Sequence, residues 1–118
     1  MVQEEDIVGV ANQLGAAINA EYVILFGSYA RGEAGPESDV DLMIIAESEL
    51  PRFKRSRELY KLFRPYPFGM DIVVYTPQEI ENGKKSPLSF VSTVLREGKT
   101  LYVGRNKNSQ AMAGKSQE

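Results

Sequence analysis

The stretch of residues 22–45 reads YVILFGSYARGEAGPESDVDLMII, and most of the predicted fold follows from it. It begins with a continuous apolar run of β-branched and aromatic residues, Tyr22–Phe26, which predicts a buried strand that Gly27 ends. Residues 33–38 contain a Gly-Pro pair, which is typical of a loop. A second apolar run predicts another strand at residues 39–46, so this stretch encodes two strands joined by a turn.

Three acidic residues lie in strand-like sequence. Asp39 and Asp41 open the second strand, and Asp71 stands in a later apolar run at residues 70–75. Side chains alternate along a strand, so Asp39 and Asp41 are expected on one face, ~6.5 Å apart. If the two strands are neighbours, Asp71 lies ~5 Å away across the sheet. Each acid could instead cap a turn, but the three together favour a shared site.

The charge of these acids predicts their chemistry. A carboxylate buried in a sheet must be paired, hydrogen-bonded or bound to a metal. No basic residue lies within two positions of any of the three, which points to an external cation. Two divalent ions ~3.5–4 Å apart would relieve the repulsion among three carboxylates, and that spacing serves displacement at phosphorus. The acids therefore predict metal-dependent chemistry on a phosphate.

The Gly-Ser pair at the end of the first strand predicts a phosphate site. Gly27 has no side chain to block a phosphate, and Ser28 is expected to be the N-cap of a short helical turn with free backbone N–H groups. Arg31 lies one turn later and could bind a phosphate oxygen. It could equally form a surface ion pair with Glu33 or Glu37. Together with the acids, the pair predicts a site for a metal-bound nucleoside triphosphate.

The remaining elements alternate helix and strand, which predicts one sheet with helices packed on it. A capping box, Thr76-Pro77-Gln78-Glu79, marks one helix start. The expected elements are a helix at 3–19, a helix from Ser48 or Glu49 to Arg64, a strand at 68–75, a helix ending near Gly83, a helix from Ser86-Pro87 to Gly98, and a strand at 101–103. Residues 105–118 are polar and small, so a disordered tail is expected after a domain at residues 1–104.

Composition limits the possible chemistry. The 118 residues, enough for one domain, contain no Cys and no His, which excludes thiol nucleophiles, imidazole catalysis and Cys- or His-ligated zinc. Any catalysis must therefore use carboxylates, hydroxyls, Lys or Arg, together with hard cations bound through oxygen. The net charge of −2 gives no overall case for nucleic-acid binding. No apolar run reaches the ~20 residues of a membrane span, and the acidic N-terminus argues against a signal or transit peptide. A cytoplasmic protein with no membrane or nucleic-acid partner is expected.

Basic residues are concentrated at residues 52–64, where six Lys and Arg stand against the single acid Glu58. Such a run is most often a solvated helix face. The alternative is a docking surface for an acidic partner or for RNA.

The spacing Gly-Ser, ten residues, Asp-x-Asp, with a later strand acid, resembles the nucleotidyltransferase superfamily typified by DNA polymerase beta. The similarity is greatest to its minimal, MNT-type branch, and it is dense over residues 25–45 and reaches Asp71. The resemblance implies an α+β fold, a two-layer α/β sandwich with a small mixed sheet. It also implies that Asp39 and Asp41 bind both of two Mg²⁺ ions. Asp71 would bind one ion and activate the attacking hydroxyl.

The resemblance further implies that Gly27 and Ser28 hold the β- and γ-phosphates of ATP, with AMP transferred and pyrophosphate released. Minimal members are often encoded beside a HEPN-domain toxin, and some are antitoxins that adenylylate a tyrosine of that toxin. The expected function is therefore a protein adenylyltransferase antitoxin. One alternative is an antitoxin that acts by binding alone. The other is a small-molecule nucleotidyltransferase of the aminoglycoside-modifying kind, against which the short chain argues.

Overall fold

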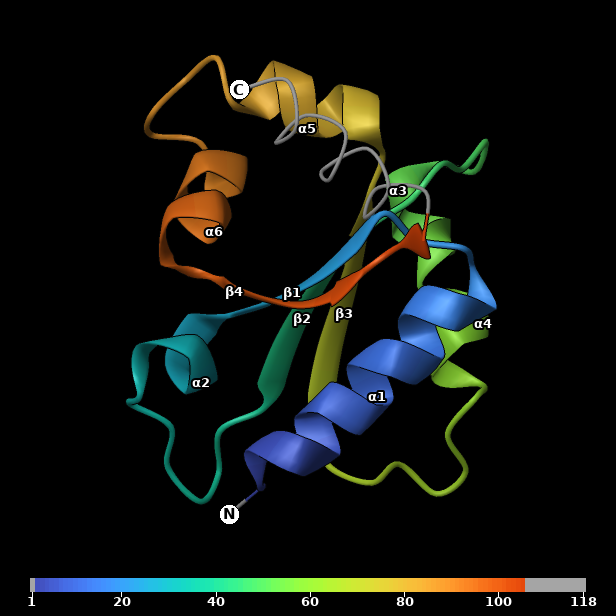
Figure 1. Ribbon diagram of the computed structural model, residues 1–118, viewed down its shortest axis with the longest axis vertical. Coiled ribbons are helices and arrows are strands. Elements are labelled where there is room, and N and C mark those ends of the chain that lie inside the picture. The colour runs from blue at the N-terminus through green and yellow to red at the C-terminus, as the bar shows by residue number, and fades with distance from the viewer. Residues whose placement is uncertain (1, 106–118) are drawn as a thin grey trace.

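The computed structural model describes residues 2–105 and contains a four-stranded mixed sheet with helices on both faces (Figure 1). The expected α+β class and small mixed sheet are confirmed. Helices pack on the second face of the sheet as well, so there are three layers where a two-layer sandwich was expected. The elements are α1 (Glu4–Ala17), β1 (Tyr22–Phe26), α2 (Gly27–Arg31), β2 (Val40–Ile45), α3 (Arg52–Arg55), α4 (Arg57–Tyr60), β3 (Met70–Tyr75), α5 (Pro77–Gly83), α6 (Phe90–Glu97) and β4 (Lys99–Val103).

The strand order in the sheet is β3-β2-β1-β4. β1 is antiparallel to β2 and to β4, whereas β2 and β3 run parallel because α3 and α4 carry the chain across. The register places Asp41 opposite Phe26 of β1 on one side and opposite Asp71 of β3 on the other. The condition under which Asp71 was expected close to Asp41, that their two strands are neighbours, is therefore met.

One face of the sheet packs against α1. Alternate residues of β2, Val40, Leu42 and Ile44, are fully buried there against the apolar stripe of α1, which includes Leu14. Burial of this kind contributes roughly 25 cal/mol per Å² of apolar surface. The helix expected at 3–19 is thus confirmed, with its ends within two residues of the expectation.

The opposite face is only partly covered. Met43 and Ile45 of β2 pack there against Ile80 of α5 and Val91 and Val94 of α6. These two short helices cover the end of the face where β2 finishes. The end where β2 begins, which carries Asp41, is left open to solvent, since Asp41 is only half-buried.

The helix expected from Ser48 or Glu49 to Arg64 is wrong. Two short helices, α3 and α4, occupy this region instead. Pro51 disfavours helical backbone at the residue before it and is itself the N-cap of α3, so no helix can begin at residue 48 or 49. After α4, the chain turns so that Phe63 reaches the core beneath α1.

Further boundaries differ from the expectation, and β3 begins at Met70, two residues later than expected. The N-cap of α2 is Phe26 and not Ser28, which is the second helical residue. α6 begins at Phe90 and not near Ser86, because the hydroxyl of Ser89 accepts the N–H of Ser92 and donates to the carbonyl of Gly83. β4 begins at Lys99, two residues earlier than expected. The expected disordered tail, apart from Arg105, lies outside the described residues.

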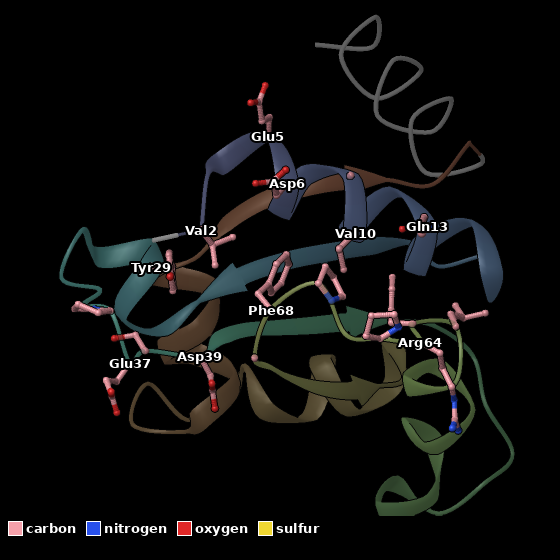
Figure 2. Close-up of a pocket in the computed structure, with 18 residues that line it drawn as sticks. Val2, Glu5, Asp6, Val10, Gln13, Tyr29, Glu37, Asp39, Arg64 and Phe68 are labelled. Atoms are coloured by element: carbon pink, nitrogen blue, oxygen red, sulfur yellow. The ribbon is translucent and has the colours of Figure 1, made fainter.

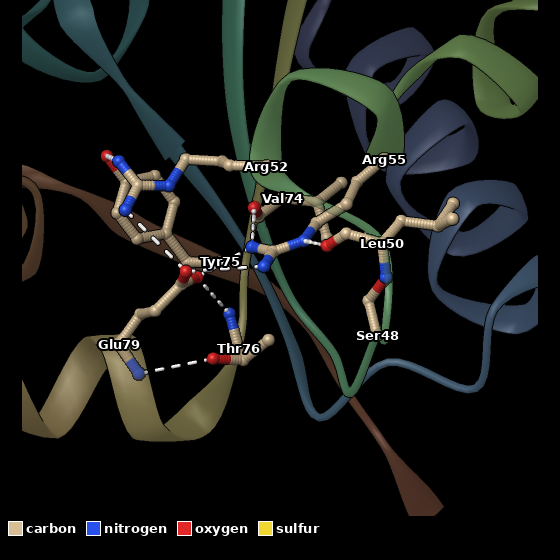
Figure 3. Close-up of polar contacts among 8 residues, drawn as sticks. All are labelled: Ser48, Leu50, Arg52, Arg55, Val74, Tyr75, Thr76 and Glu79. Atoms are coloured by element: carbon tan, nitrogen blue, oxygen red, sulfur yellow. Dashed lines mark hydrogen bonds and ion pairs between the residues drawn. The ribbon is translucent and has the colours of Figure 1, made fainter.

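A buried ion pair fastens α3 to α5 (Figure 3). The Arg55 side chain is only 8% exposed and binds Glu79 through two hydrogen bonds of 2.6 and 3.2 Å. It also donates to the carbonyls of Leu50 and Val74. Arg52 stacks on the Tyr75 ring at 4.4 Å. A solvated helix face is therefore the wrong interpretation for Arg55, because its side chain is buried and its partners Glu79 and Val74 lie far away in sequence.

The edge of the sheet at β3 is held by a side chain. The hydroxyl of Tyr60 accepts the N–H of Ile72 at 2.8 Å and lies 3.4 Å from the carbonyl oxygen of Met70, to which it donates. These two backbone groups flank Asp71 and fix the start of the strand. Within residues 2–105, no helix is long and apolar enough to cross a bilayer.

Candidate active site

Asp41 and Asp71 are brought together at the start of two parallel strands. They are register partners, and both project from the face that carries Met43 and Val73. The helices α5 and α6 leave this end of the face open, so Asp71 is exposed and Asp41 is half-buried. The premise that these acids are buried within the sheet is therefore wrong for Asp39 and Asp71, which are both exposed. A strand end that no helix covers leaves its side chains in solvent.

The electrostatics of Asp41 reflect this crowding. Partial burial raises the pKa of Asp41 above its ordinary value, and the neighbouring charges of Asp71 and Asp39 raise the pKa further. Asp41 and Asp71 are register partners on adjacent strands, so their side chains are neighbours. Arg31 lies near enough to lower the pKa of Asp41 slightly. Two like charges on adjacent strands attract a cation, which would favour the ionised form of both.

Two glycines make room for the carboxylates. A Cβ built on Gly27 would overlap the Oδ2 atom of Asp41, and one built on Gly69 would overlap the Oδ1 atom of Asp39. Gly27 also has a φ of +74°, a conformation that other residues adopt at a cost. The backbone at these two points is thus shaped around the acids. The space beside Gly27 was expected to admit a phosphate, but the Asp41 carboxylate occupies it.

The donor set fits a hard divalent cation. Carboxylate oxygens are the ligands that Mg²⁺ and Ca²⁺ prefer, and the Asp41–Asp71 pair provides them. The negative charges of the two side chains repel each other, and a cation between them would relieve this repulsion. Asp39 is offset, with its carboxylate against Gly69. As placed in residues 2–105, no three acidic side chains gather tightly enough to hold an ion. The structure therefore unites two of the three predicted ligands and keeps the third close by.

Ser28 lies beside these acids, on the first turn of α2. Its side chain is half-buried, and its hydroxyl has no hydrogen-bond partner in the part of the chain that the structure describes. The helix starts directly after Phe26, the residue opposite Asp41 in β2. A free hydroxyl and the first N–H groups of a helix are therefore placed next to the carboxylates.

Arg31 takes the surface ion pair that was one of its two predicted roles. Its Nε atom donates to Glu33 at 2.9 Å, and its guanidinium lies 3.8 Å from Glu97 of α6. The hydrogen bond to Glu33 raises the pKa of Arg31. The pairs are exposed and therefore easily exchanged. A contact with phosphate would need Arg31 to leave these partners.

The sequence reasoning missed an aromatic cluster on the same face. Phe26 lies edge-on to Phe90 with ring centroids 5.5 Å apart, and Tyr75 lies 6.0 Å from Phe90 on the other side. Phe90 is 46% exposed although it is large and apolar. Alternation along β1 places Phe26 beside Asp41, which was a usable signal. Nothing in the sequence predicted that Phe90 of α6 would join it.

Comparisons with known proteins agree with this geometry. The family described as "Nucleotidyltransferase domain" matches residues 13–110. A Methanocaldococcus jannaschii protein named "Putative protein adenylyltransferase" is 44% identical over 86 residues, which cover 73% of this chain and 71% of that protein.

Two solved structures share the fold. A "putative nucleotidyltransferase from Sulfolobus solfataricus" superposes with a TM-score of 0.59 at 20% identity, over 87% of this chain and 81% of that one. A chain of a toxin–antitoxin complex crystallised with AMP-PNP superposes with a TM-score of 0.52 at 17% identity, over 87% of this chain and 78% of that one.

Proposed function

Because the chain belongs to the nucleotidyltransferase domain family, we propose that it is a protein adenylyltransferase that uses ATP and Mg²⁺. The acceptor proposed is a tyrosine hydroxyl of a HEPN-domain toxin, and the chain is the antitoxin. The single observation that carries the proposal is the pairing of Asp41 with Asp71, beside the free hydroxyl of Ser28 at the start of α2. Acids and anion donors in one place suit a triphosphate only when cations join them.

In this proposal Asp39, Asp41 and Asp71 hold two Mg²⁺ ions. When bound, the ions neutralise the phosphate charge and favour in-line displacement. Asp41 and Asp71 are already adjacent, while Asp39 needs a rotation of its exposed side chain away from Gly69. The charge repulsion that raises the pKa of Asp41 is relieved in the same event.

The transfer step forms one bond and breaks one. The tyrosine oxygen attacks the α-phosphorus of ATP, a new P–O bond forms, and the bond from the α-phosphorus to the bridging oxygen breaks. Pyrophosphate leaves with that bonding pair. Asp71, exposed at the start of β3, accepts the proton of the attacking hydroxyl. The products are AMP-tyrosine and pyrophosphate.

The ATP molecule is proposed to lie over α2 and the aromatic cluster. Gly27 and Ser28 bind the β- and γ-phosphates through backbone N–H groups and the hydroxyl, and Arg31 leaves Glu33 to join them. The exposed ring of Phe90, in contact with Phe26, offers a stacking surface for the base.

The protein acceptor is supported by the relatives named as protein adenylyltransferases. Toxin–antitoxin assembly is known for a protein of the same fold. The HEPN identity of the partner rests on the resemblance of the Gly-Ser and Asp-x-Asp motifs.

The test is label transfer. The protein is mixed with the product of the adjacent reading frame, Mg²⁺ and ATP labelled at the α- or the γ-phosphate, followed by intact-mass analysis. Label from the α-position should appear on the partner, and Asp39→Asn and Asp41→Asn should abolish it. Glu49→Gln, an exposed acid outside the site, is the matched control and should transfer normally. Transfer from the γ-position alone would refute the proposal in favour of a kinase.

A cell-protection assay separates catalysis from binding. If the acid-to-amide variants still protect cells from the toxin, the protein neutralises its partner by contact alone. If protection is lost together with label transfer, the chemistry is the antitoxin activity.

A further inference from the structure

One hollow in the described part of the molecule is lined by neither Asp41 nor Asp71. It is a groove of about 1050 Å³ between α1, the loop at residues 36–39 and the loop at residues 62–69 (Figure 2). We call it the α1 groove. Its lining is mixed: polar groups make up the larger share of the exposed surface, and apolar side chains that include Val10, Leu62 and Phe68 lie among them. Leu62 is 48% exposed and lies in this lining.

The α1 groove ends at the candidate active site. Asp39 lines one end, and Figure 2 shows Glu37 beside it and Arg64 at the other end, with Phe68 between. Gly69, whose missing side chain makes room for the Asp39 carboxylate, belongs to the same lining. A chain lying in the groove therefore reaches Asp39 from the α1 side of the sheet.

The rim of the groove is acidic where it approaches the site. Glu5 and Asp6 of α1 and Glu37 and Asp39 of the facing loop line it, against the single cation Arg64. Arg64 stands at the far end. A triphosphate or an RNA backbone would be repelled here, since like charges at such distances oppose binding. The groove is therefore suited to a substrate other than the nucleotide.

A glycine in α1 leaves the groove open. Gly9 lies within the helix, where glycine is less favourable than alanine, and it lines the groove. A Cβ built on Gly9 would meet nothing within 4 Å. Packing within the protein thus gives no reason for a glycine here, and the space it leaves belongs to the groove.

We propose that the α1 groove binds the acceptor polypeptide, as an apolar segment whose lysine or arginine residues flank the hydroxyl to be modified. The basic flanks pair with Asp6 and Glu37, the apolar residues lie on Phe68 and Leu62, and the hydroxyl is presented past Asp39. The proposal rests on the proposed function and adds the chemical class of its acceptor.

The test measures peptide binding without nucleotide. Fluorescein-labelled short peptides with a central tyrosine, flanked by leucine and by lysine, glutamine or glutamate, are titrated into the full chain by fluorescence anisotropy. The lysine peptide should bind about tenfold more tightly than the glutamate peptide, and added salt should reduce the difference. The double variant Asp6→Asn, Glu37→Gln should lose the preference, whereas Glu49→Gln should keep it.

Filling the groove gives an independent test. Gly9→Leu should weaken binding of the lysine peptide at least about tenfold. The melting temperature of this variant should equal or exceed that of the wild-type protein. Gly9→Ala, which adds one methyl group in open space, should bind the peptide normally. Equal binding of all three peptides, or unchanged binding by Gly9→Leu, would overturn the groove assignment, as would displacement of the lysine peptide by equimolar oligoadenylate RNA.

The outcome is separable from that of the proposed function. If Gly9→Leu transfers label to the partner as well as the wild type does, the proposed adenylyltransferase activity stands and only the assignment of the α1 groove is overturned. Peptide binding with the predicted charge preference, but without label transfer from α-labelled ATP, would uphold the groove and count against the enzyme.

Discussion

Replacement of Gly27 by alanine tests whether the backbone there is shaped around Asp41. The new Cβ would overlap the Oδ2 atom of Asp41, and it would occupy a residue whose φ is +74°. The variant therefore applies two perturbations, a strained backbone and a displaced carboxylate. The first affects stability and the second affects catalysis, so they can be measured apart.

The two effects have different sizes. A residue with a side chain in the left-handed region costs about 1–2 kcal/mol, which lowers the melting temperature of a domain this size by roughly 4–8 °C. Relief of the overlap requires the Asp41 carboxylate to move by roughly 1 Å, and a misplacement of that size at a reacting centre costs about 10²-fold in rate. We expect a folded protein with about 1% of the wild-type label transfer.

Gly32→Ala is the matched control for Gly27→Ala. Gly32 ends the same helix with a φ of +72°, yet a Cβ there would meet nothing within 4 Å. It should therefore lose similar stability and keep its activity. Both variants are assayed by thermal denaturation and by transfer of label from α-labelled ATP to the partner.

The comparison can fail in a clear way. If both variants retain the same fraction of activity, the Asp41 carboxylate is not held by the space at Gly27. If Gly27→Ala stays within about threefold of the wild type, a 1 Å displacement is not costly there and the assignment of Asp41 to the reacting centre is wrong.

Four further predictions concern the site and its support. Asp71→Asn should lower label transfer by about 10²–10⁴-fold without lowering the melting temperature, because it also removes repulsion with Asp41; a loss of stability that matched the loss of activity would point to a structural role. Chelation of divalent ions should abolish transfer, and Mg²⁺ or Mn²⁺ should restore it; activity that survives dialysis against EDTA would contradict the metal assignment. Arg31→Ala should raise the KM for ATP about threefold to tenfold with the melting temperature unchanged, since its ion pairs are exposed; an unchanged KM would limit Arg31 to the ion pair with Glu33. Hydrogen bonds from Arg55 lower the pKa of Glu79 from 4.5 to about 2, so the stability that this pair contributes is present above pH 4.5 and is lost as the pH falls towards 2. Glu79→Gln should accordingly lose about 1–2 kcal/mol at pH 7 and approach the wild type near pH 2 in urea denaturation, whereas a pH-independent difference would show that the charge is not responsible.

The strands could be predicted because their signals are local. The run Tyr22–Phe26 is continuously apolar and ended by glycine, and Val40–Ile45 is apolar apart from Asp41. The strand sequences at 40–45 and 70–75 carried Asp41 and Asp71, so the meeting of these acids followed once the two strands were taken as neighbours. Their exposure could not be predicted, because it depends on where α5 and α6 end over the sheet.

The errors arose where distant residues decide the local structure. The six basic residues between 52 and 64 suggested a solvated helix face, but Arg55 is buried against Glu79 and the carbonyl of Val74, which lie far from it in sequence. Pro51 alone was enough to predict the later helix start. The α1 groove lies between three segments that are remote in sequence, so no pattern in the chain predicts it.

The hydrogen bonds of Tyr60 have a consequence for how these molecules coexist in solution. β3 is an outermost strand, and such strands invite pairing with strands of other molecules. Tyr60 satisfies the outward backbone groups of Met70 and Ile72, and Arg55 satisfies the carbonyl of Val74. These two side chains take the place that a foreign strand would occupy. The protein is thereby protected from edge-to-edge aggregation at the border nearest to its acids.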